Sequence, residues 1–509
     1  MKQQHNHRNR QRRPNILVLM TDQQRWDSLG VYGCDFAHTP NLDRLGREGV
    51  VFDNCYVNNP ICTPSRASMM TGKHLPGHGV YRLYDVLPED EVLFPERLRQ
   101  LGYTTALFGK LHVSAVDYEH YQRHPHDGFD VFEPCMEGCL RMDAPYQAYA
   151  QWLREKHPEF HDRLARDLRQ VLHHPQEVHM TRWAAERTID FLQRQDDEKP
   201  FFCMMSIFDP HNPYEDYPLE MEALVDRARI PDPVIDEQPV AVKPAAVRRE
   251  HHGSYMGDFA KYALDDLRAM RYGYHASLAF ADQEFGRVLD ALEAQGLTDN
   301  TLVIFTSDHG DMLGDHGLLV KGAFFYEANV RVPLLIRPPR NQGAPFRRVD
   351  GLVQLHDLAA TVLAAAGMDH DEIARLMPES HDLLPLCSAT GQTGHEFAIC
   401  CYRNSGQSSE PSRTPYFDPP IHATMIRDGR YKLNLFHEPY DHSGAGEGEL
   451  YDMADDPGEQ RNCWADPAYA AIKAALLARL RQWLRDHETQ PGSRGGECLA
   501  RVQMQNAGK

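Results

Sequence analysis

Short, almost wholly apolar runs alternate along this chain with longer segments in which hydrophobic residues recur at helical spacing. The runs cover residues 16–20, 104–108, 201–207, 302–306 and 332–336. Continuous apolar runs of this length are typical of strands that are buried on both faces of a parallel sheet. Strands that alternate with helices predict an α/β fold, with a mostly parallel central sheet and helices on both faces.

The helix patterns lie between and after these runs. An apolar stripe with three- and four-residue spacing indicates an amphipathic helix, and glycine or proline indicates where several of these helices begin or end. The expected helices cover 40–49, 65–70, 94–101, a longer helical region over 146–195, 278–292 and a stripe over 352–366. Residues 215–270 are rich in proline, which favours an irregular surface excursion.

The character of the chain changes after about residue 380. Apolar residues on both sides of 427–430 predict a hairpin, 450–451 adds a further strand, and 472–484 carries the stripe of a closing helix. We therefore expect a catalytic domain over 14–380 and a smaller C-terminal α+β subdomain over 381–509, with a short antiparallel sheet. The first 13 residues are basic and predict a disordered tail.

Composition narrows the possible functions. The 509 residues are 42% hydrophobic and carry a formal net charge of −19, so we expect neither nucleic-acid nor membrane partners. An anionic substrate would need a local basic pocket. The 11 cysteines are scattered without the spacing of a disulfide framework. With no signal peptide or membrane span recognised, the sequence predicts a cytoplasmic protein.

Polar residues follow four of the predicted strands. Any one such cluster could be an ordinary loop, but the carboxyl ends of parallel strands meet at one edge of the sheet, where ligands bind. Oxygen ligands with one imidazole suit Ca²⁺, Mg²⁺ or Mn²⁺. The clusters contain Asp22 and Gln23, Lys110 and His112, His211, and Asp308 and His309.

A lone cysteine beside a proline is most often a small buried hydrophobe. Cys62, however, begins the sequence Cys-Thr-Pro-Ser-Arg and precedes a predicted helix that ends at Gly72. A helix N-terminus favours anions, and Arg66 adds a positive charge one turn away. This pentapeptide and its Thr-Gly tail resemble the signature of the type I sulfatases of the alkaline phosphatase superfamily.

The resemblance implies a specific chemistry. In that family the cysteine is oxidised to formylglycine by a formylglycine-generating enzyme, and the hydrate of this aldehyde is the nucleophile. The resemblance implies that Asp22, Gln23, Asp308 and His309 bind one divalent metal together with residue 62. Gln23 departs from the more common aspartate of the family. Calcium is the first expectation for the metal, with Mn²⁺ or Mg²⁺ as alternatives.

The remaining candidate residues also match family segments. Lys110 and His112 lie in Gly-Lys-Leu-His, His211 in Pro-His-Asn-Pro-Tyr and Lys321 in Leu-Val-Lys-Gly. The resemblance implies that Arg66, Lys110 and Lys321 neutralise the sulfuryl oxygens. We expect His211 to be the general acid for the leaving alcohol and His112 to be the base that allows sulfate release.

These observations predict a sulfatase that acts on a small-molecule or saccharide sulfate ester. One alternative is a phosphonate monoester or phosphodiester hydrolase of the same superfamily, which would share the aldehyde nucleophile. A second alternative is a catalytically silent binding protein in which Cys62 stays unmodified. The sequence leaves open the natural substrate and whether the protein forms an oligomer.

Overall fold

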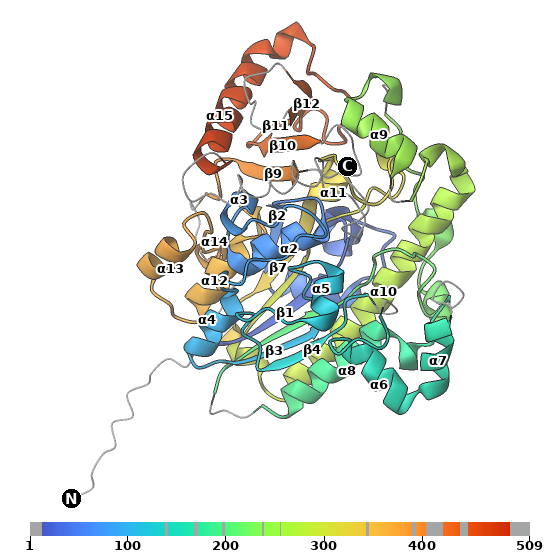
Figure 1. Cartoon of the computed structure of the whole chain (residues 1–509), viewed down its shortest axis with the longest axis vertical. Coiled ribbons are helices and arrows are strands. Elements are labelled where there is room, and N and C mark those ends of the chain that lie inside the picture. Colours follow the sequence, from blue (N-terminus) through green and yellow to red (C-terminus); the bar gives the residue numbers. More distant parts are fainter. Residues whose placement is uncertain are drawn as a thin grey trace, which may run out of the picture.

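An eight-stranded sheet forms the centre of the molecule, and a four-stranded sheet lies beside it (Figure 1). The large sheet has the strand order β4-β3-β5-β1-β6-β7-β2-β8, and the small one has the order β12-β11-β10-β9. The computed structural model describes residues 13–137, 141–166, 172–195, 199–236, 239–254, 256–342, 346–388, 393–403, 421–437 and 446–488.

The four strands predicted to end in polar clusters lie next to one another and run parallel. They are β1 (Asn15–Thr21), β3 (Thr104–Gly109), β5 (Phe201–Ser206) and β6 (Thr301–Ser307). Thr21 is in register with Ser307, and Gly109 with Ser206. The residues that follow these strands therefore leave the sheet side by side at one edge, as the sequence predicted.

The sequence pattern missed three strands of the large sheet, and two of these form its edges. Strand β7 (Arg331–Arg337) was predicted, and it runs antiparallel to both β6 and β2 (Val50–Tyr56). Strands β2, β4 (Val131–Pro134) and β8 (Arg347–Gln354) were not predicted, because charged or partly exposed residues interrupt their apolar runs. Leu352 was assigned to a helix stripe and instead lies in β8; the helix α12 starts at Asp357.

Alternate side chains of each central strand pack into two separate hydrophobic cores, one on each face of the sheet. In β1, Ile16, Val18 and Met20 belong to one core and Leu17 and Leu19 to the other. The first core is covered by α2 (Cys62–Thr71), α4 (Phe94–Gln100) and α12 (Asp357–Ala365). The second is covered by α1 (Pro40–Arg47), α8 (Met180–Gln193) and α10 (Leu264–Ala294). Helices on both faces confirm the predicted class.

Several shorter helices complete the large domain. The region 215–270 is less irregular than expected, because α9 lies within it and α10 begins before its end. The described residues of the segment 146–195 form three α-helices rather than one long helical region. The remaining helices are α3 (Leu75–His78), α5 (Val116–Tyr121), α6 (Ala148–Lys156), α7 (Pro158–Arg166), α9 (Ala245–Gly253), α11 (Glu327–Val330), α13 (His370–Leu376) and α14 (Leu384–Ser388).

The small sheet is antiparallel and packs between the large domain and helix α15 (Ala470–Glu488) (Figure 1). The predicted hairpin is formed by β10 (His422–Arg427) and β11 (Tyr431–His437), with β9 (Ala398–Arg403) and β12 (Glu447–Asp452) outside it. The side chains alternate: Ile399 and Cys401 face α15, whereas Cys400 and Tyr402 belong to the core of the large domain. The boundary at residue 380 stays a prediction.

Within the part of the chain that the structure describes, no helix is both long and apolar enough to cross a bilayer. The tail expected over 1–13 lies outside the described residues, apart from Arg13, which donates a hydrogen bond to the carbonyl of Leu101.

Candidate active site

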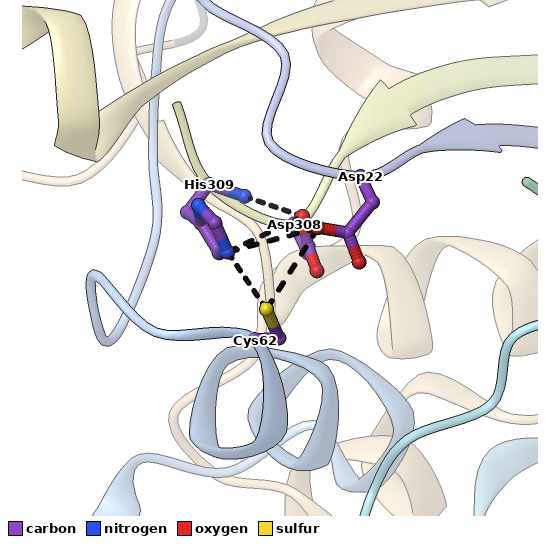
Figure 2. A group of neighbouring side chains, drawn as sticks. All are labelled: Asp22, Cys62, Asp308 and His309. Atoms are coloured by element: carbon purple, nitrogen blue, oxygen red, sulfur yellow. Dashed lines mark hydrogen bonds and ion pairs between the residues drawn. The ribbon is translucent and has the colours of Figure 1, made fainter. Parts of the chain in front are cut away.

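Four buried side chains from three different segments meet at the carboxyl edge of the large sheet (Figure 2). Asp22 follows β1, Asp308 and His309 follow β6, and Cys62 is the first residue of α2. One ligand atom from each lies within 4.8 Å of those of the other three. The strand register explains this convergence, because Thr21 and Ser307 are paired neighbours.

The helix that presents Cys62 starts earlier than the sequence suggested. It begins at Cys62 itself rather than at Ser65, and Gly72 ends it in the left-handed conformation, with φ of 70°. The Sγ atom of Cys62 lies 2.9 Å from Nε2 of His309 and 3.8 Å from Oδ1 of Asp22. Residue 62 therefore sits at a helix N-terminus and directly against the cluster, where a bound anion would be favoured.

Arg66 holds the two carboxylates in place from one turn further along α2. Its Nε donates to Oδ2 of Asp308 at 2.6 Å, and its Nη2 donates to Oδ2 of Asp22 at 3.0 Å. Its Nη1 donates to the Lys110 carbonyl and to Oγ of Ser206, both at 3.0 Å. All three guanidinium nitrogens are thus engaged by the protein, and the side chain is fully buried. Arg66 contacts the carboxylates rather than standing free to meet a ligand.

Asp22 also forms an ion pair with Lys110, whose Nζ lies 2.8 Å from Oδ2 of Asp22. Burial alone would raise the pKa of Asp22, but Lys110 and Arg66 outweigh burial and hold that pKa well below its ordinary value. Asp22 is therefore ionised, and its Oδ1 faces Cys62 and His309. The same contact raises the pKa of Lys110, which stays a cation.

The orientation of His309 fits a metal ligand. Its Nδ1 lies 2.9 Å from the carbonyl of Gly310, which can only accept, so Nδ1 carries the proton. Nε2 faces Cys62, with an oxygen of Asp22 and an oxygen of Asp308 each 3.9 Å away, so it is the ring nitrogen that a metal would bind. A backbone carbonyl that fixes the other ring nitrogen is the common support of a metal-binding histidine. Two carboxylates and an imidazole are therefore able to hold a divalent cation.

Gln23 lies beside this cluster and links it to a second group of residues. Its backbone N–H donates to Oδ1 of Asp308 at 3.0 Å, and its backbone has φ of 65°. Its Oε1 accepts a hydrogen bond of 2.6 Å from Lys321, and its Nε2 donates to Oδ2 of Asp311 at 2.6 Å. Tyr214 donates to the same oxygen of Asp311 at 2.7 Å. Because its oxygen already accepts from Lys321, the metal-binding role of Gln23 stays a proposal.

His211 forms a pair with Lys321. Its Nδ1 donates to the carbonyl of Asn212 at 2.6 Å, so Nε2 is free to accept from the Lys321 ammonium, 2.7 Å away. Burial and then the charge of Lys321 lower the pKa of His211 well below its ordinary value. His211 is thus neutral, and the proton nearest to it belongs to Lys321.

His112 lies on the other side of the nucleophile position. Its Nε2 is 2.9 Å from Oγ1 of Thr63, the residue after Cys62. Burial lowers the pKa of His112 well below its ordinary value, and the charges of Lys110 and Arg66 lower it further. His112 is therefore a neutral imidazole, which is the form that can accept a proton.

The structure places all ten sequence-predicted site residues in one connected network of contacts. Sequence reasoning did not single out several residues that hold them: Thr63, Glu119, Ser206, Asn212, Tyr214 and Asp311. Thr63, Asn212 and Tyr214 lie within motifs already quoted and Asp311 follows Asp308 and His309 closely, so proximity to a motif was the available signal. Glu119 had no such signal.

Comparison with known proteins agrees with this geometry. Residues 14–368 match the sulfatase family model, and residues 314–486 match the C-terminal model of N-sulphoglucosamine sulphohydrolase. An arylsulfatase of Clostridium perfringens is 33% identical over 365 residues, covering 69% of this chain and 74% of that protein. An N-acetylglucosamine-6-O-sulfatase of Bacteroides thetaiotaomicron is 26% identical over 538 residues, covering 94% and 87%.

Among solved structures, a phosphonate monoester hydrolase of Agrobacterium radiobacter superimposes with a TM-score of 0.77 at 26% identity, covering 93% of this chain and 96% of that one. The alkaline-phosphatase-like sheet, the signature helix at Cys62 and the matched family model together identify the chain: it belongs to the sulfatase family of enzymes.

Proposed function

We propose that this enzyme hydrolyses sulfate monoesters, with formylglycine formed from Cys62 as nucleophile and one divalent metal bound by Asp22, Gln23, residue 62, Asp308 and His309. The observation that carries the proposal is the meeting of Cys62 with two carboxylates and Nε2 of His309. Calcium is the first expectation, because most of these donors are hard oxygens; Mn²⁺ and Mg²⁺ are the alternatives.

A divalent metal and formylglycine, which the family generally uses, would supply the electrophilic and the nucleophilic chemistry. A bound metal would polarise the sulfuryl oxygens, and the hydrated aldehyde at position 62 would supply one hydroxyl for attack and a second for release of sulfate. The protein contributes fixed charge in a buried site, where preorganised electrostatics act most strongly. Arg66 serves by fixing Asp22 and Asp308, whereas Lys110 and Lys321 are the cations nearer to the ester.

Two histidines divide the proton transfers. The Lys321–His211 pair is placed to protonate the leaving alcohol, with the proton drawn from the ammonium that already contacts Nε2. His112 is neutral and is placed beside residue 62 through Thr63, so it is our candidate for the base that takes the proton of the second hydroxyl. Each role needs only a neutral imidazole or a lysine ammonium.

A second candidate function has a specific observation in its favour. The phosphonate monoester hydrolase of Agrobacterium radiobacter covers nearly the whole chain at 26% identity. Hydrolysis of phosphonate monoesters or phosphodiesters would use the same nucleophile and cations. The intact set of acid, base and ligand side chains argues against the third alternative, a silent binding protein.

The substrate of the sulfatase activity is proposed to be a small-molecule or saccharide sulfate ester. The relative named N-acetylglucosamine-6-O-sulfatase supports a saccharide. A formylglycine-generating enzyme is the required partner for maturation. Cytoplasmic location and any oligomer stay predictions.

The test is a substrate panel on protein shown by mass spectrometry to carry the aldehyde. We expect turnover of 4-nitrophenyl sulfate to exceed that of a phenyl phosphonate monoester in kcat/KM, with both lost in Cys62→Ala and after metal chelation. A higher kcat/KM for the phosphonate ester would instead favour the second candidate. Turnover of neither ester by aldehyde- and metal-loaded protein would overturn both.

A further inference from the structure

His112 sits in a backbone conformation that side chains rarely adopt. It ends the turn that follows β3, and its φ of 58° lies in the left-handed region. A non-glycine residue stays in that region when surrounding contacts hold it there, and such residues gather at functional sites. Two contacts hold His112, one on its backbone and one on its ring, and no role has so far been assigned to either partner.

The backbone contact comes from Glu119 on α5. Its Oε2 accepts the N–H of His112 at 2.9 Å, and its Oε1 accepts the N–H of Ser114 at 2.8 Å. Glu119 is 8% exposed, and its two carboxylate oxygens bind the backbone on either side of Val113. This arrangement fixes the path of the chain on both sides of Val113 and therefore fixes where the His112 side chain begins.

The ring contact comes from Thr63. Its Oγ1 lies 3.1 Å from the carbonyl oxygen of Leu83, and because a carbonyl can only accept, the Thr63 hydroxyl donates there. The same oxygen must then accept from Nε2 of His112, 2.9 Å away. The proton of the neutral ring is thus placed on Nε2. Nδ1 is left with its lone pair, and among the described residues it has no hydrogen-bond partner although it is buried.

We propose that Glu119 and Thr63 are positioning residues that hold His112 in the orientation and the Nε2–H tautomer in which Nδ1 is the proton acceptor. The inference rests on the proposed function for the role of the base, but the tautomer itself does not depend on any activity. It assigns the nitrogen of His112 that accepts the proton, with Thr63 as the side chain that selects it and Glu119 as the side chain that fixes the backbone.

The tautomer can be measured directly. In protein with ¹⁵N-labelled histidine, the His112 signals are assigned by their loss in His112→Gln, and protonated and unprotonated ring nitrogens are distinguished by their shifts. We expect Nε2 to be protonated in the parent protein and in Thr63→Ser, and Thr63→Val to show Nδ1–H or a mixture. Thr188→Val removes a buried hydroxyl on the distant helix α8 and should leave the signals unchanged. An Nδ1–H tautomer in the parent protein, or an unchanged tautomer in Thr63→Val, would overturn the assignment.

The positioning role of Glu119 is tested by measuring release of the alcohol, the first step, separately from steady-state turnover, which also requires release of sulfate. In Glu119→Ala we expect the first equivalent of alcohol to be released at a near-normal rate, with steady-state turnover reduced about 10- to 100-fold, since small misplacements of a catalytic group cost up to about 10²-fold. Glu119→Gln keeps one carbonyl oxygen as acceptor and should lie between. Asp117→Asn removes an exposed carboxyl from the same helix and should match the parent.

A general structural role of Glu119 would reduce the burst of alcohol and the steady-state rate together. That result, or an unchanged steady-state rate, would overturn the positioning role of Glu119. Formylglycine content is measured for every variant, so that a loss of maturation is not counted as a loss of rate. The tautomer measurement uses protein with unmodified Cys62. It therefore remains informative if the proposed sulfatase activity fails. If Glu119→Ala does not fold, the kinetic test is made on Glu119→Gln.

Discussion

The ammonium of Lys321 donates a hydrogen bond of 2.7 Å to Nε2 of His211, and the opposite ring nitrogen donates to the carbonyl of Asn212. Burial and Lys321 keep the pKa of His211 low. In the proposed mechanism the proton for the leaving alcohol therefore comes from the Lys321 ammonium, which contacts Nε2 of His211. The basicity of the leaving alcohol therefore tests whether this pair is the general acid, because a more basic alcohol depends more on protonation.

His211→Ala should lose activity in proportion to the basicity of the leaving alcohol. With 4-nitrophenyl sulfate we expect kcat/KM to fall less than about 10-fold, and with an alkyl sulfate about 100-fold or more, the range for general acid catalysis. Lys321→Ala should add a loss on both substrates, because its charge also faces the ester. Equal losses of His211→Ala on the two substrates would remove His211 from the acid role.

The second prediction concerns the nucleophile. The peptide that contains residue 62 should show a mass lower by about 18 Da when the thiol has become an aldehyde. Cys62→Ala should abolish turnover while circular dichroism and thermal unfolding stay close to those of the parent protein, because the buried thiol is small. Fully active protein with an unmodified thiol would contradict the proposed chemistry.

The third prediction concerns the metal. Asp22→Ala and Asp308→Ala should each lower metal affinity by more than about 100-fold, since even outer partners of metal ligands contribute about 10- to 100-fold. His309→Asn should be milder, because an amide retains a donor at similar reach. Metal content after dialysis measures the effect, with Asp350→Asn, on the solvent-facing part of β8, as the matched control. Normal metal content in both aspartate variants would place the ion elsewhere.

The sequence predicted the four strands that lead to the site better than it predicted the rest of the sheet. Strands β1, β3, β5 and β6 are buried on both faces, so their apolar runs are continuous and easily recognised. Strand β2 contains Asp53 and Asn54 at partly exposed positions, and β8 contains arginines. Local pattern does not distinguish such strands from loops, because their pairing depends on residues far away in the chain.

The same distinction applies to the site. Asp22 and Asp308 follow strands directly, so the topology rule for parallel sheets brings them together. Arg66 illustrates what the rule does not provide: the motif identified the residue, but only the structure shows that its three nitrogens are engaged by Asp22, Asp308, Ser206 and a backbone carbonyl. Glu119 acts on His112 through backbone N–H groups, which leave no pattern in a single sequence.

The last prediction concerns stability and a pair outside the active site. Asp357, at the start of α12, accepts a hydrogen bond from Nε2 of His395 at 2.8 Å and from the backbone N–H groups of Gln354 and His381. Burial alone would raise the pKa of Asp357, but the nearby histidines and hydrogen bonds outweigh burial and lower it to about 2. The carboxylate in turn raises the pKa of His395.

These shifts set the pH range in which the pair stabilises the fold. A lowered carboxyl pKa contributes stability above its unfolded value, about 3.9, and that contribution is lost as the pH falls toward 2, about 2–3 kcal/mol in total. A raised histidine pKa contributes below about 6.5 and is lost as the pH rises through the folded value. The pair should therefore stabilise most between about pH 4 and 6.5.

Urea unfolding across this range tests the pair. Asp357→Asn should be less stable than the parent by about 2–3 kcal/mol near pH 5.5, and the difference should shrink both toward pH 2 and above pH 7. His356 and His381 face the same carboxylate, but their pKa values are lowered, chiefly by burial, so they do not replace His395 as the cation. Asp371→Asn, an exposed change on the neighbouring helix α13, should show no such profile. A difference that is independent of pH would mean that Asp357 acts only as a hydrogen-bond acceptor for the backbone and that its charge does not contribute to stability.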